Sequence, residues 1–183
     1  MHLEIREATT DDAEAIVGIL NPIIETGAYT VFDTPFTTEA EREYLLKLPS
    51  RGVFLVAVRQ ADGRIVGFQS MEPFANYTHA FDHVGVLGTY VDLACRRQGI
   101  ATALFRATFD AALRKGYEKI FTFVRADNSA ALNTYLRQGF RIVGTAFRQA
   151  RIGGKYVDEI IIEKQLAVVS GPAEAGRHDT GSG

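Results

Sequence analysis

The sequence predicts an α/β domain built on one mixed β-sheet. Strand-like and helix-like stretches follow one another in the order strand, helix, helix, three strands, helix, strand, helix and two strands, which is typical of helices packed on a sheet. The 183 residues are enough for one domain with its own core, and 46% apolar with 23% charged residues is typical of a soluble globular protein. At the centre of this order, over residues 91–104, an apolar strand turns directly into a helix.

The N-terminal part predicts a strand followed by two helices. Residues 3–8 alternate apolar and charged side chains, which indicates a strand. The hydroxyl and acidic side chains of residues 9–12 then cap a helix with an apolar face, and we expect Pro22 to break or kink this helix. Residues 25–36 are irregular and rich in aromatic side chains, and a Thr38-x-x-Glu41 capping box begins a second short helix.

Three strands are predicted next. Residues 53–58 and 65–71 are apolar runs joined by turn residues, and they predict a hairpin. A loop over residues 73–81 leads to a strand over residues 83–93, whose glycines allow a bulge or the close approach of another backbone.

The C-terminal half predicts the rest of the sheet. The helix after residue 99 ends at Lys115-Gly116, residues 120–124 form a strand, and Asn128 begins a helix that stops at Gly139. Residues 140–148 and 156–163 predict a closing antiparallel pair around Gly153-Gly154. We expect a domain of residues 1–169 and a flexible tail, 170–183, whose Gly-, Ser- and Ala-rich composition cannot bury enough apolar surface.

The composition argues against several classes of protein. A net charge of −2 argues against a general nucleic-acid binder, and no apolar run reaches the length of a membrane span. Residues 1–4 do not resemble a signal peptide, and the one cysteine, Cys95, can form no intramolecular disulfide. We therefore expect a cytoplasmic protein that binds no nucleic acid, membrane or metal.

The central turn predicts a binding site for phosphate. It holds Arg96 and Arg97 and reaches Gly99 where the helical pattern begins. The first amides of a helix have no intrahelical partner, and a glycine there lets a ligand approach the backbone closely. The glycine patterns of a P-loop and of a Rossmann fold are both absent from the sequence. The motif alone is equally consistent with an ordinary strand-turn-helix that binds no phosphate and has two solvated arginines.

Arg96-x-x-Gly99-x-Ala101 resembles the R/Q-x-x-G-x-G/A signature of the GNAT superfamily of acyl-CoA-dependent N-acyltransferases. Residues 124–131 and the run Tyr135-x-x-x-Gly139-Phe140 are similar to two further motifs of that family. The element order over residues 3–165 also resembles its fold, which is a mixed, mostly antiparallel central sheet flanked by about four helices.

This resemblance implies acetyl-CoA as the cofactor. The amides of the central loop would bind its diphosphate, the main chain of Val91 would donate to the thioester carbonyl, and Tyr135 would protonate the departing thiolate. The pantetheine arm would fill a gap between the central strand and residues 120–124. The implied cofactor-binding residues are Val91, Asp92, Leu93, Arg96, Arg97, Gln98, Gly99, Ile100, Ala101, Thr102, Asn128 and Tyr135. Asn128 is equally typical of a helix N-cap, and Tyr135 of a packed aromatic residue.

Residues 21–36 resemble the entry segment of phosphinothricin acetyltransferases, which implies transfer to the primary amine of a small molecule, an amino acid or an analogue. The candidate substrate residues are Tyr29, Phe32, Tyr77 and His79. Two features of that branch are absent: arginines in the loop after the third strand, and a glutamate on the fourth strand, where Val86 stands. The general base is therefore open among Glu72, His79, His83 and Asp92.

Three alternatives remain open from the sequence. The acceptor could be a protein N-terminus or lysine, or the domain could be an acyl-CoA sensor without turnover. An acyl-cysteine route through Cys95 lacks an adjacent base, so we expect Cys95 to pack in the loop. The resemblance also suggests a homodimer, because this is common among the relatives.

Overall fold

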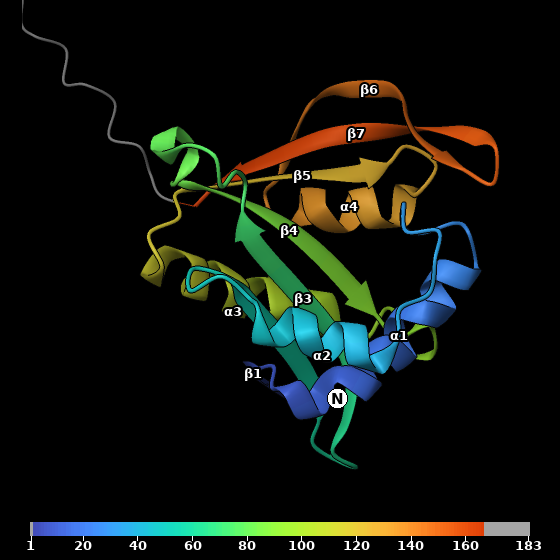
Figure 1. Ribbon diagram of the computed structural model, residues 1–183, viewed down its shortest axis with the longest axis vertical. Helices are drawn as coiled ribbons and strands as arrows, with labels where there is room; N and C mark the ends of the chain where they lie inside the picture. Colours follow the sequence, from blue (N-terminus) through green and yellow to red (C-terminus); the bar gives the residue numbers. More distant parts are fainter. Residues whose placement is uncertain (1, 167–183) are drawn as a thin grey trace, which may run out of the picture.

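The computed structural model describes residues 2–166, which form one seven-stranded sheet in the order β1-β2-β3-β4-β5-β7-β6 with helices on both faces (Figure 1). Neighbouring strands are antiparallel except β4 and β5, so the expected mixed, mostly antiparallel sheet is confirmed. The predicted tail, 170–183, lies outside the described residues, and the domain boundary after residue 169 stays a prediction. The strands are β1 (Leu3–Glu7), β2 (Val53–Arg59), β3 (Arg64–Pro73), β4 (Val84–Val91), β5 (Lys119–Arg125), β6 (Arg141–Ile152) and β7 (Lys155–Gln165).

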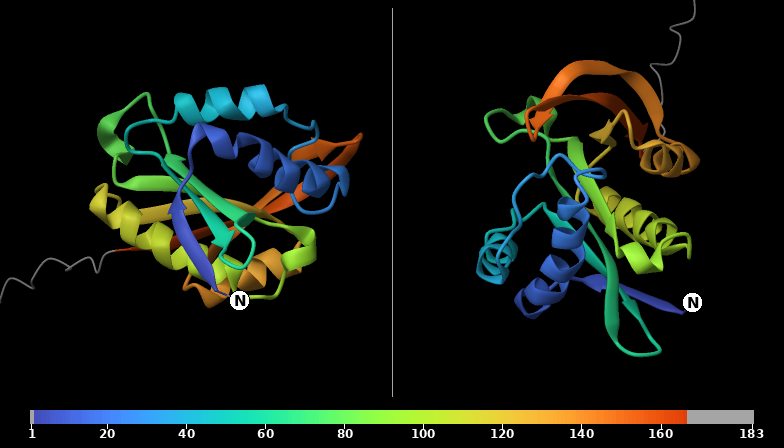
Figure 2. Two further views of the ribbon diagram at one scale, coloured as in Figure 1. Left: turned by 90° about the horizontal axis from the view of Figure 1, so that it is seen from below. Right: turned by 90° about the vertical axis from the view of Figure 1, so that its right-hand side faces the viewer.

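The four α-helices are divided between the two faces of the sheet. Two of them, α1 and α2, lie on one face, and α3 and α4 lie on the other (Figure 2). No helix among residues 2–166 is long and apolar enough to cross a membrane. The helices are α1 (Ala13–Glu25), α2 (Thr38–Leu46), α3 (Ile100–Arg114) and α4 (Ser129–Arg137), with short 3₁₀ helices η1 (Thr10–Asp12), η2 (His79–Phe81) and η3 (Leu93–Cys95).

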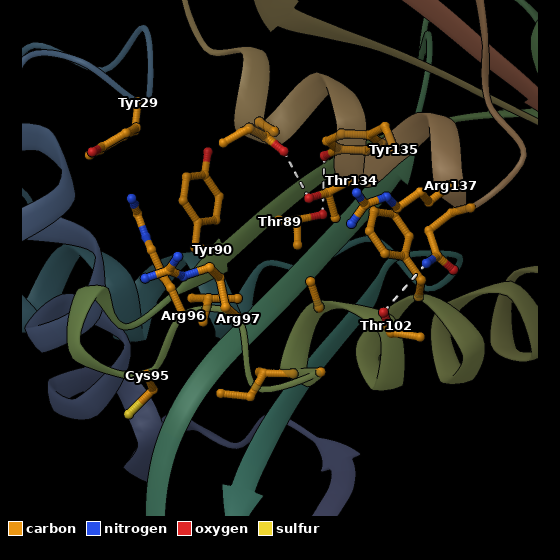
Figure 3. A pocket seen from close by; sticks show the side chains of 18 of the residues that line it. Tyr29, Thr89, Tyr90, Cys95, Arg96, Arg97, Thr102, Thr134, Tyr135 and Arg137 are labelled. Atoms are coloured by element: carbon orange, nitrogen blue, oxygen red, sulfur yellow. Dashed lines mark hydrogen bonds between the residues drawn. The ribbon is translucent and has the colours of Figure 1, made fainter.

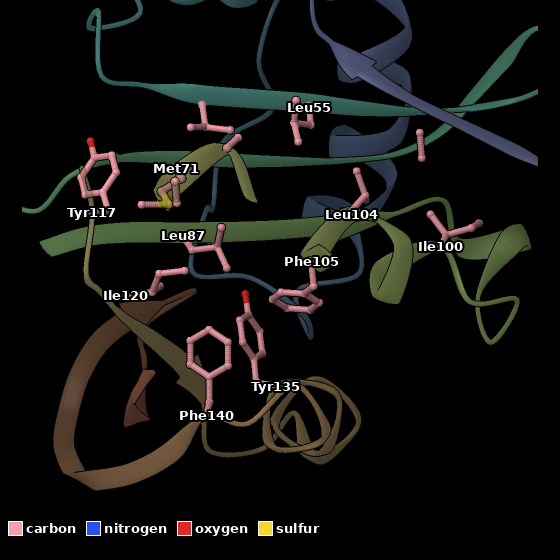
Figure 4. Close-up of a cluster of buried hydrophobic side chains, with 14 of the residues drawn as sticks. Leu55, Met71, Leu87, Ile100, Leu104, Phe105, Tyr117, Ile120, Tyr135 and Phe140 are labelled. Atoms are coloured by element: carbon pink, nitrogen blue, oxygen red, sulfur yellow. The ribbon is translucent and has the colours of Figure 1, made fainter. Parts of the chain in front are cut away.

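Each face of the sheet has its own apolar core. Under α3, the buried side chains of Leu104 and Phe105 pack with Leu87 of β4 and Ile120 of β5 (Figure 4). Under α1, a second buried cluster joins the helix to β2 and β3 and includes Ile16, Leu20, Phe54, Val56 and Phe68. The central strands, buried on both faces, therefore read as continuous apolar runs in the sequence.

The parallel contact between β4 and β5 is very short. It pairs Val84 with Lys119 and Gly85 with Ile120, and beyond this point the two strands separate. The Thr122 hydroxyl of β5 donates a 2.7 Å hydrogen bond to the Leu87 carbonyl, which takes the place of a ladder bond where the gap begins. The predicted divergence of the central strand from residues 120–124 is confirmed.

Of the predicted break or kink at Pro22, the break does not occur, because α1 runs through this residue to Glu25. An internal proline costs about 3 kcal/mol of helix stability. The buried apolar face of α1 on β2 and β3, which extends past Pro22 to Ile23 and Ile24, outweighs that cost.

The predicted capping box is misplaced by one residue. Helix α2 has Thr37 as its N-cap, and the Thr37 hydroxyl accepts a 3.1 Å hydrogen bond from the Ala40 amide. This register moves Glu41 into the fourth helical position, where its side chain turns inward and is 6% exposed. Burial raises the pKa of Glu41 above its ordinary value.

Helix α3 approaches the sheet closely at Gly67 of β3, where a side chain would not fit. A Cβ atom at this position would lie 2.8 Å from Ile100 Cγ2 and 3.0 Å from the Tyr90 carbonyl oxygen. We expect Gly67→Ala to lower the free energy of unfolding by about 1–3 kcal/mol, because it overpacks the contact between β3 and α3. The measurement is urea denaturation. Gly144→Ala is the matched control, because a Cβ atom there meets nothing within 4 Å, and an equal loss in both variants would contradict the prediction.

Candidate functional site

A cavity of about 530 Å³ lies where β4 ends and α3 and α4 begin (Figure 3). Its wall is formed by the end of β4, the turn before α3, the first turn of α3 and one side of α4. The predicted site residues that line it are Tyr29, Val91, Arg96, Arg97, Gly99, Ile100, Ala101, Thr102, Asn128 and Tyr135. The structure thus brings together segments that are far apart in the sequence.

Backbone amides of β4 point toward the gap beside β5. The Asp92 amide donates to the Val66 carbonyl of β3 at 3.0 Å, and Val91 stands opposite Gly67 in the same ladder. Since hydrogen-bonded and non-hydrogen-bonded pairs alternate in an antiparallel ladder, the Val91 amide points away from β3. The Thr89 amide, two residues earlier, has the same direction. Both amides lie beyond the two residue pairs that join β4 to β5.

The turn before α3 concentrates positive charge and unpaired donors. Gly99 has a φ of +82° and Arg97 a φ of +60°, so two left-handed residues direct the chain into the helix. A Cβ atom at Gly99 would meet nothing within 4 Å, which leaves open space over the first amides of α3. With Arg96 and Arg97 beside that space, the arrangement is suited to an anion such as a phosphate.

Arg96 is held by an aromatic ring from a distant segment. Its guanidinium carbon lies 4.0 Å from the centre of the Tyr29 ring, which belongs to the loop between α1 and α2. A guanidinium stacked on an aromatic face keeps its N–H edge available for other acceptors. Among residues 2–166, no carboxylate pairs with Arg96.

Tyr135 lies at the opposite wall of the cavity, in a chain of hydrogen bonds from β3. The Gln69 amide nitrogen donates to the Thr89 hydroxyl at 2.7 Å, and the Thr89 hydroxyl lies 3.1 Å from the Tyr135 hydroxyl. With Gln69 as its donor, Thr89 can direct its own proton to the Tyr135 oxygen, which frees the Tyr135 proton for a ligand. Burial raises the pKa of Tyr135 above its ordinary value, so this hydroxyl is protonated at neutral pH.

Asn128 has the predicted N-cap role. Its side-chain oxygen accepts a 3.1 Å hydrogen bond from the Ala131 amide at the start of α4. Its side-chain nitrogen donates to the Tyr29 carbonyl at 3.4 Å. Its contact with a cofactor stays a prediction.

Some predicted residues lie outside the cavity wall. Asp92 forms an ion pair with Arg64 and accepts from the Ala94 amide, and Leu93 lies in the exposed start of η3. Gln98 does not line the cavity, and Phe32 stacks on Tyr90 just beside it. The cofactor contacts of Asp92, Leu93 and Gln98 and the substrate contact of Phe32 stay predictions.

The structure does not bring Tyr77 and His79 to the wall of this cavity, and their contact with a substrate stays a prediction. Both residues precede β4, whereas the cavity lies at its far end. Tyr77 is 78% exposed, and the His79 ring pairs with Asp82 at 3.0 Å. Strand β4 therefore separates this loop from the cavity along the chain.

The structure identifies two further residues that the sequence analysis missed, Gln69 and Thr89. Gln69 is fully buried in β3. A polar amide within an apolar strand needs a hydrogen-bond partner, and this sequence feature could have identified Gln69 as a candidate. Thr89 stands two residues before Val91 and therefore shares its edge of β4. Its hydroxyl lies 3.1 Å from that of Tyr135.

Of the other candidate groups, Cys95 lines the cavity, whereas Glu72 has its partner elsewhere. Cys95 is buried at 4% exposure, as expected, with the Arg59 guanidinium 3.9 Å from its sulfur. Glu72 accepts a hydrogen bond from the Tyr44 hydroxyl of α2, on the opposite face of the sheet from α3. Among residues 2–166 no cluster of histidine, cysteine and carboxylate side chains could hold a metal ion.

Comparison with known proteins gives a consistent picture. Residues 22–140 match the model of the acetyltransferase (GNAT) family. The chain is 25% identical over 166 residues to a phosphinothricin N-acetyltransferase of Streptomyces coelicolor, covering 90% of this chain and 96% of the relative. A ribosomal-protein-alanine N-acetyltransferase of Brucella melitensis superposes with a TM-score of 0.81 at 26% identity, over 88% of this chain and 99% of the other. A phosphinothricin acetyltransferase of Sinorhizobium meliloti in complex with acetyl-CoA has the same fold, with a TM-score of 0.84 at 19% identity over 98% of each chain.

Proposed function

Because the chain belongs to the acetyltransferase (GNAT) family, we propose that it transfers the acetyl group of acetyl-CoA to the primary amine of a small molecule, an amino acid or an analogue. The enzyme is an N-acetyltransferase and its cofactor is acetyl-CoA. The proposal depends on one observation: a single cavity extends from the start of α3 to Tyr135. The start of α3 is suited to a phosphate. The resemblance of the whole chain to a phosphinothricin N-acetyltransferase supports the small-molecule acceptor.

The cavity fits the cofactor at both ends. The open space over Gly99, the first amides of α3 and the two arginines suit a diphosphate. The amides of Thr89 and Val91 point into the gap beside β5, where an extended amide-bearing arm adds hydrogen bonds as a strand does. We propose that Arg96, Arg97 and residues 99–102 hold the diphosphate, and that Asn128 lies beside the arm.

The chemistry follows from the groups at the end of β4. Acetyl-CoA supplies an activated acyl carbon and a thiol leaving group. The fixed amide of Thr89 or Val91 can stabilise the negative charge that develops on the carbonyl oxygen. Transfer requires that the amine lose a proton and that the departing sulfur gain one, and Tyr135 holds a proton next to Thr89 for the sulfur. Direct attack by the amine needs no protein nucleophile, which agrees with the buried state of Cys95.

A second candidate acceptor is the N-terminus of a protein. The ribosomal-protein-alanine N-acetyltransferase of Brucella favours this acceptor, because its identity to the chain, 26%, is close to the 25% of the phosphinothricin relative.

A cytoplasmic location and a homodimer are further parts of the proposal. A single buried cysteine supports the first, and light scattering of the purified protein would test the second.

An amine panel tests the acceptor class. Purified protein is mixed with acetyl-CoA and either amino acids and their analogues or alanine-ended peptides, and thiol release is followed. We expect kcat/KM for the best small amine to exceed that for the peptides at least about tenfold, because the aromatic side chains of residues 25–36 favour a small-molecule pocket. Turnover of peptides alone would assign the second candidate, and coenzyme A binding without amine-dependent thiol release would indicate a sensor.

Substitution of Gly99 tests where the diphosphate binds. We expect Gly99→Glu to weaken coenzyme A binding more than about 100-fold in calorimetry, because a carboxylate then occupies the anion site. Gly154→Glu is the matched control: Gly154 has a φ of +81°, nothing within 4 Å of a Cβ atom, and a place in the β6–β7 turn. Unchanged affinity in a folded Gly99→Glu protein would refute this placement.

Substitution of Tyr135 tests the proton donor. We expect Tyr135→Phe to lower kcat about 100-fold, in the range of general-acid catalysis, while the Kd for coenzyme A changes less than about threefold. Stopped-flow acetyl transfer and calorimetry measure the two quantities. Equal losses of kcat and affinity would show that Tyr135 contributes to packing alone.

A further inference from the structure

Arg125, at the end of β5, fastens the loop between α1 and α2. Its side chain is 7% exposed, and one guanidinium nitrogen donates to the carbonyls of Gly27 at 2.8 Å and Thr30 at 3.0 Å. The other two nitrogens donate to the carboxylate of Asp127 at 2.9 and 2.7 Å. A buried cation is thus shared between a neighbouring carboxylate and a loop that lies nearly one hundred residues away in the sequence.

The fastened loop carries the residue that holds Arg96. Tyr29 lies between the two carbonyls that Arg125 binds, and its own carbonyl accepts from Asn128. The Tyr29 ring then stacks against the Arg96 guanidinium at 4.0 Å, at the edge of the cavity (Figure 3). These contacts connect β5, the loop between α1 and α2, and the turn before α3.

This arrangement fixes the orientation of an arginine that would otherwise be free. Holding a long side chain in one rotamer removes an entropy cost from ligand binding, and a stacked guanidinium presents its N–H edge to an anion. The ion pair with Asp127 raises the pKa of Arg125, although burial alone would lower it. The guanidinium is charged at neutral pH in any case, so its hold on the loop depends on the hydrogen bonds to the carbonyls of Gly27 and Thr30.

We propose that Arg125 is a positioning residue for the diphosphate of acetyl-CoA, acting through the loop 27–30 and Tyr29 on Arg96. The proposal rests on the proposed function, because it takes the turn before α3 as the diphosphate site. Arg125 itself lies outside the cavity wall, so its effect is transmitted by the loop.

A double-mutant cycle read by calorimetry with coenzyme A tests this role. We expect Arg125→Gln to weaken coenzyme A binding about fivefold in the native background, in the range of a lost cation–π contact. In the Arg96→Gln background the same substitution has less than about a twofold effect, because the residue that it orients is gone. An equal effect in both backgrounds would overturn the proposal, since a general loss of structure does not depend on Arg96.

Matched variants separate the steps of the proposed chain of contacts. Tyr29→Leu removes the stacking ring and reproduces the effect of Arg125→Gln, and the two together are not additive. Asp127→Asn is the control: it removes a charge that is bonded to Arg125 but leaves the carbonyls of Gly27 and Thr30 in place, so affinity changes less than about twofold. If Arg125→Gln does not fold, Tyr29→Leu in the two backgrounds carries the same test.

The same cycle distinguishes this proposal from the diphosphate placement on which it depends. If Arg96→Gln alone leaves the affinity for coenzyme A unchanged, the proposed diphosphate site fails. If Arg96→Gln weakens binding while Arg125→Gln and Tyr29→Leu do not, the site stands and the positioning role of Arg125 is refuted.

Discussion

The separation of β4 from β5 is the constraint on which the site depends. A strand in the middle of a sheet normally has both edges paired, and an unpaired buried amide costs free energy. Here β4 and β5 share two residue pairs and then diverge, and the Thr122 hydroxyl satisfies the Leu87 carbonyl at the start of the gap. Further along β4, the amides of Thr89 and Val91 face the cavity, where a ligand can supply the missing partners. The binding capacity therefore originates in an incomplete sheet.

Elements that short sequence patterns determine could be predicted from the sequence. The prediction failed where contacts with distant parts of the chain determine the structure. The hairpin of β2 and β3, the α3 start at Gly99 and the turn at Gly153-Gly154 follow from short patterns, and all three are confirmed. Pro22 misled the prediction of α1, because the burial of that helix against two strands is not visible in the local sequence.

The same distinction applies to the candidate site. Residues 96–102 were accessible to sequence reasoning because one contiguous turn supplies them, and most of them line the cavity. The hydrogen bonds among Gln69, Thr89 and Tyr135 join three separate elements, and they depend on a strand register that the sequence alone does not give. Tyr77 and His79 illustrate the same limit, because only the structure shows that they precede β4 while the cavity lies at the other end of this strand.

The aromatic segment between α1 and α2 serves both the core and the cavity. At one end, Asn21 exchanges two 2.9 Å hydrogen bonds with the backbone of Phe36, which closes the segment against α1. At the other end, Arg125 and Asn128 hold the backbone around Tyr29. A loop held at both ends loses little further entropy when it contacts a ligand, so its aromatic side chains can stay exposed without being mobile.

Tyr135 shows how the core sets the position of the reactive groups. Its ring lies 5.1 Å from the rings of both Phe105 and Phe140, edge to face, and so it belongs to the core beneath α3 (Figure 4). Its hydroxyl nevertheless reaches Thr89 on β4, across the gap between the strands. As the proposed proton donor, Tyr135 is fixed by three close-packed elements and needs no reorganisation when a ligand arrives. In the proposed transfer without a protein nucleophile, positioning of this kind would be the main source of catalysis. In the proposed mechanism, the packing that stabilises α3 and α4 on the sheet thus also determines where the departing sulfur finds its proton.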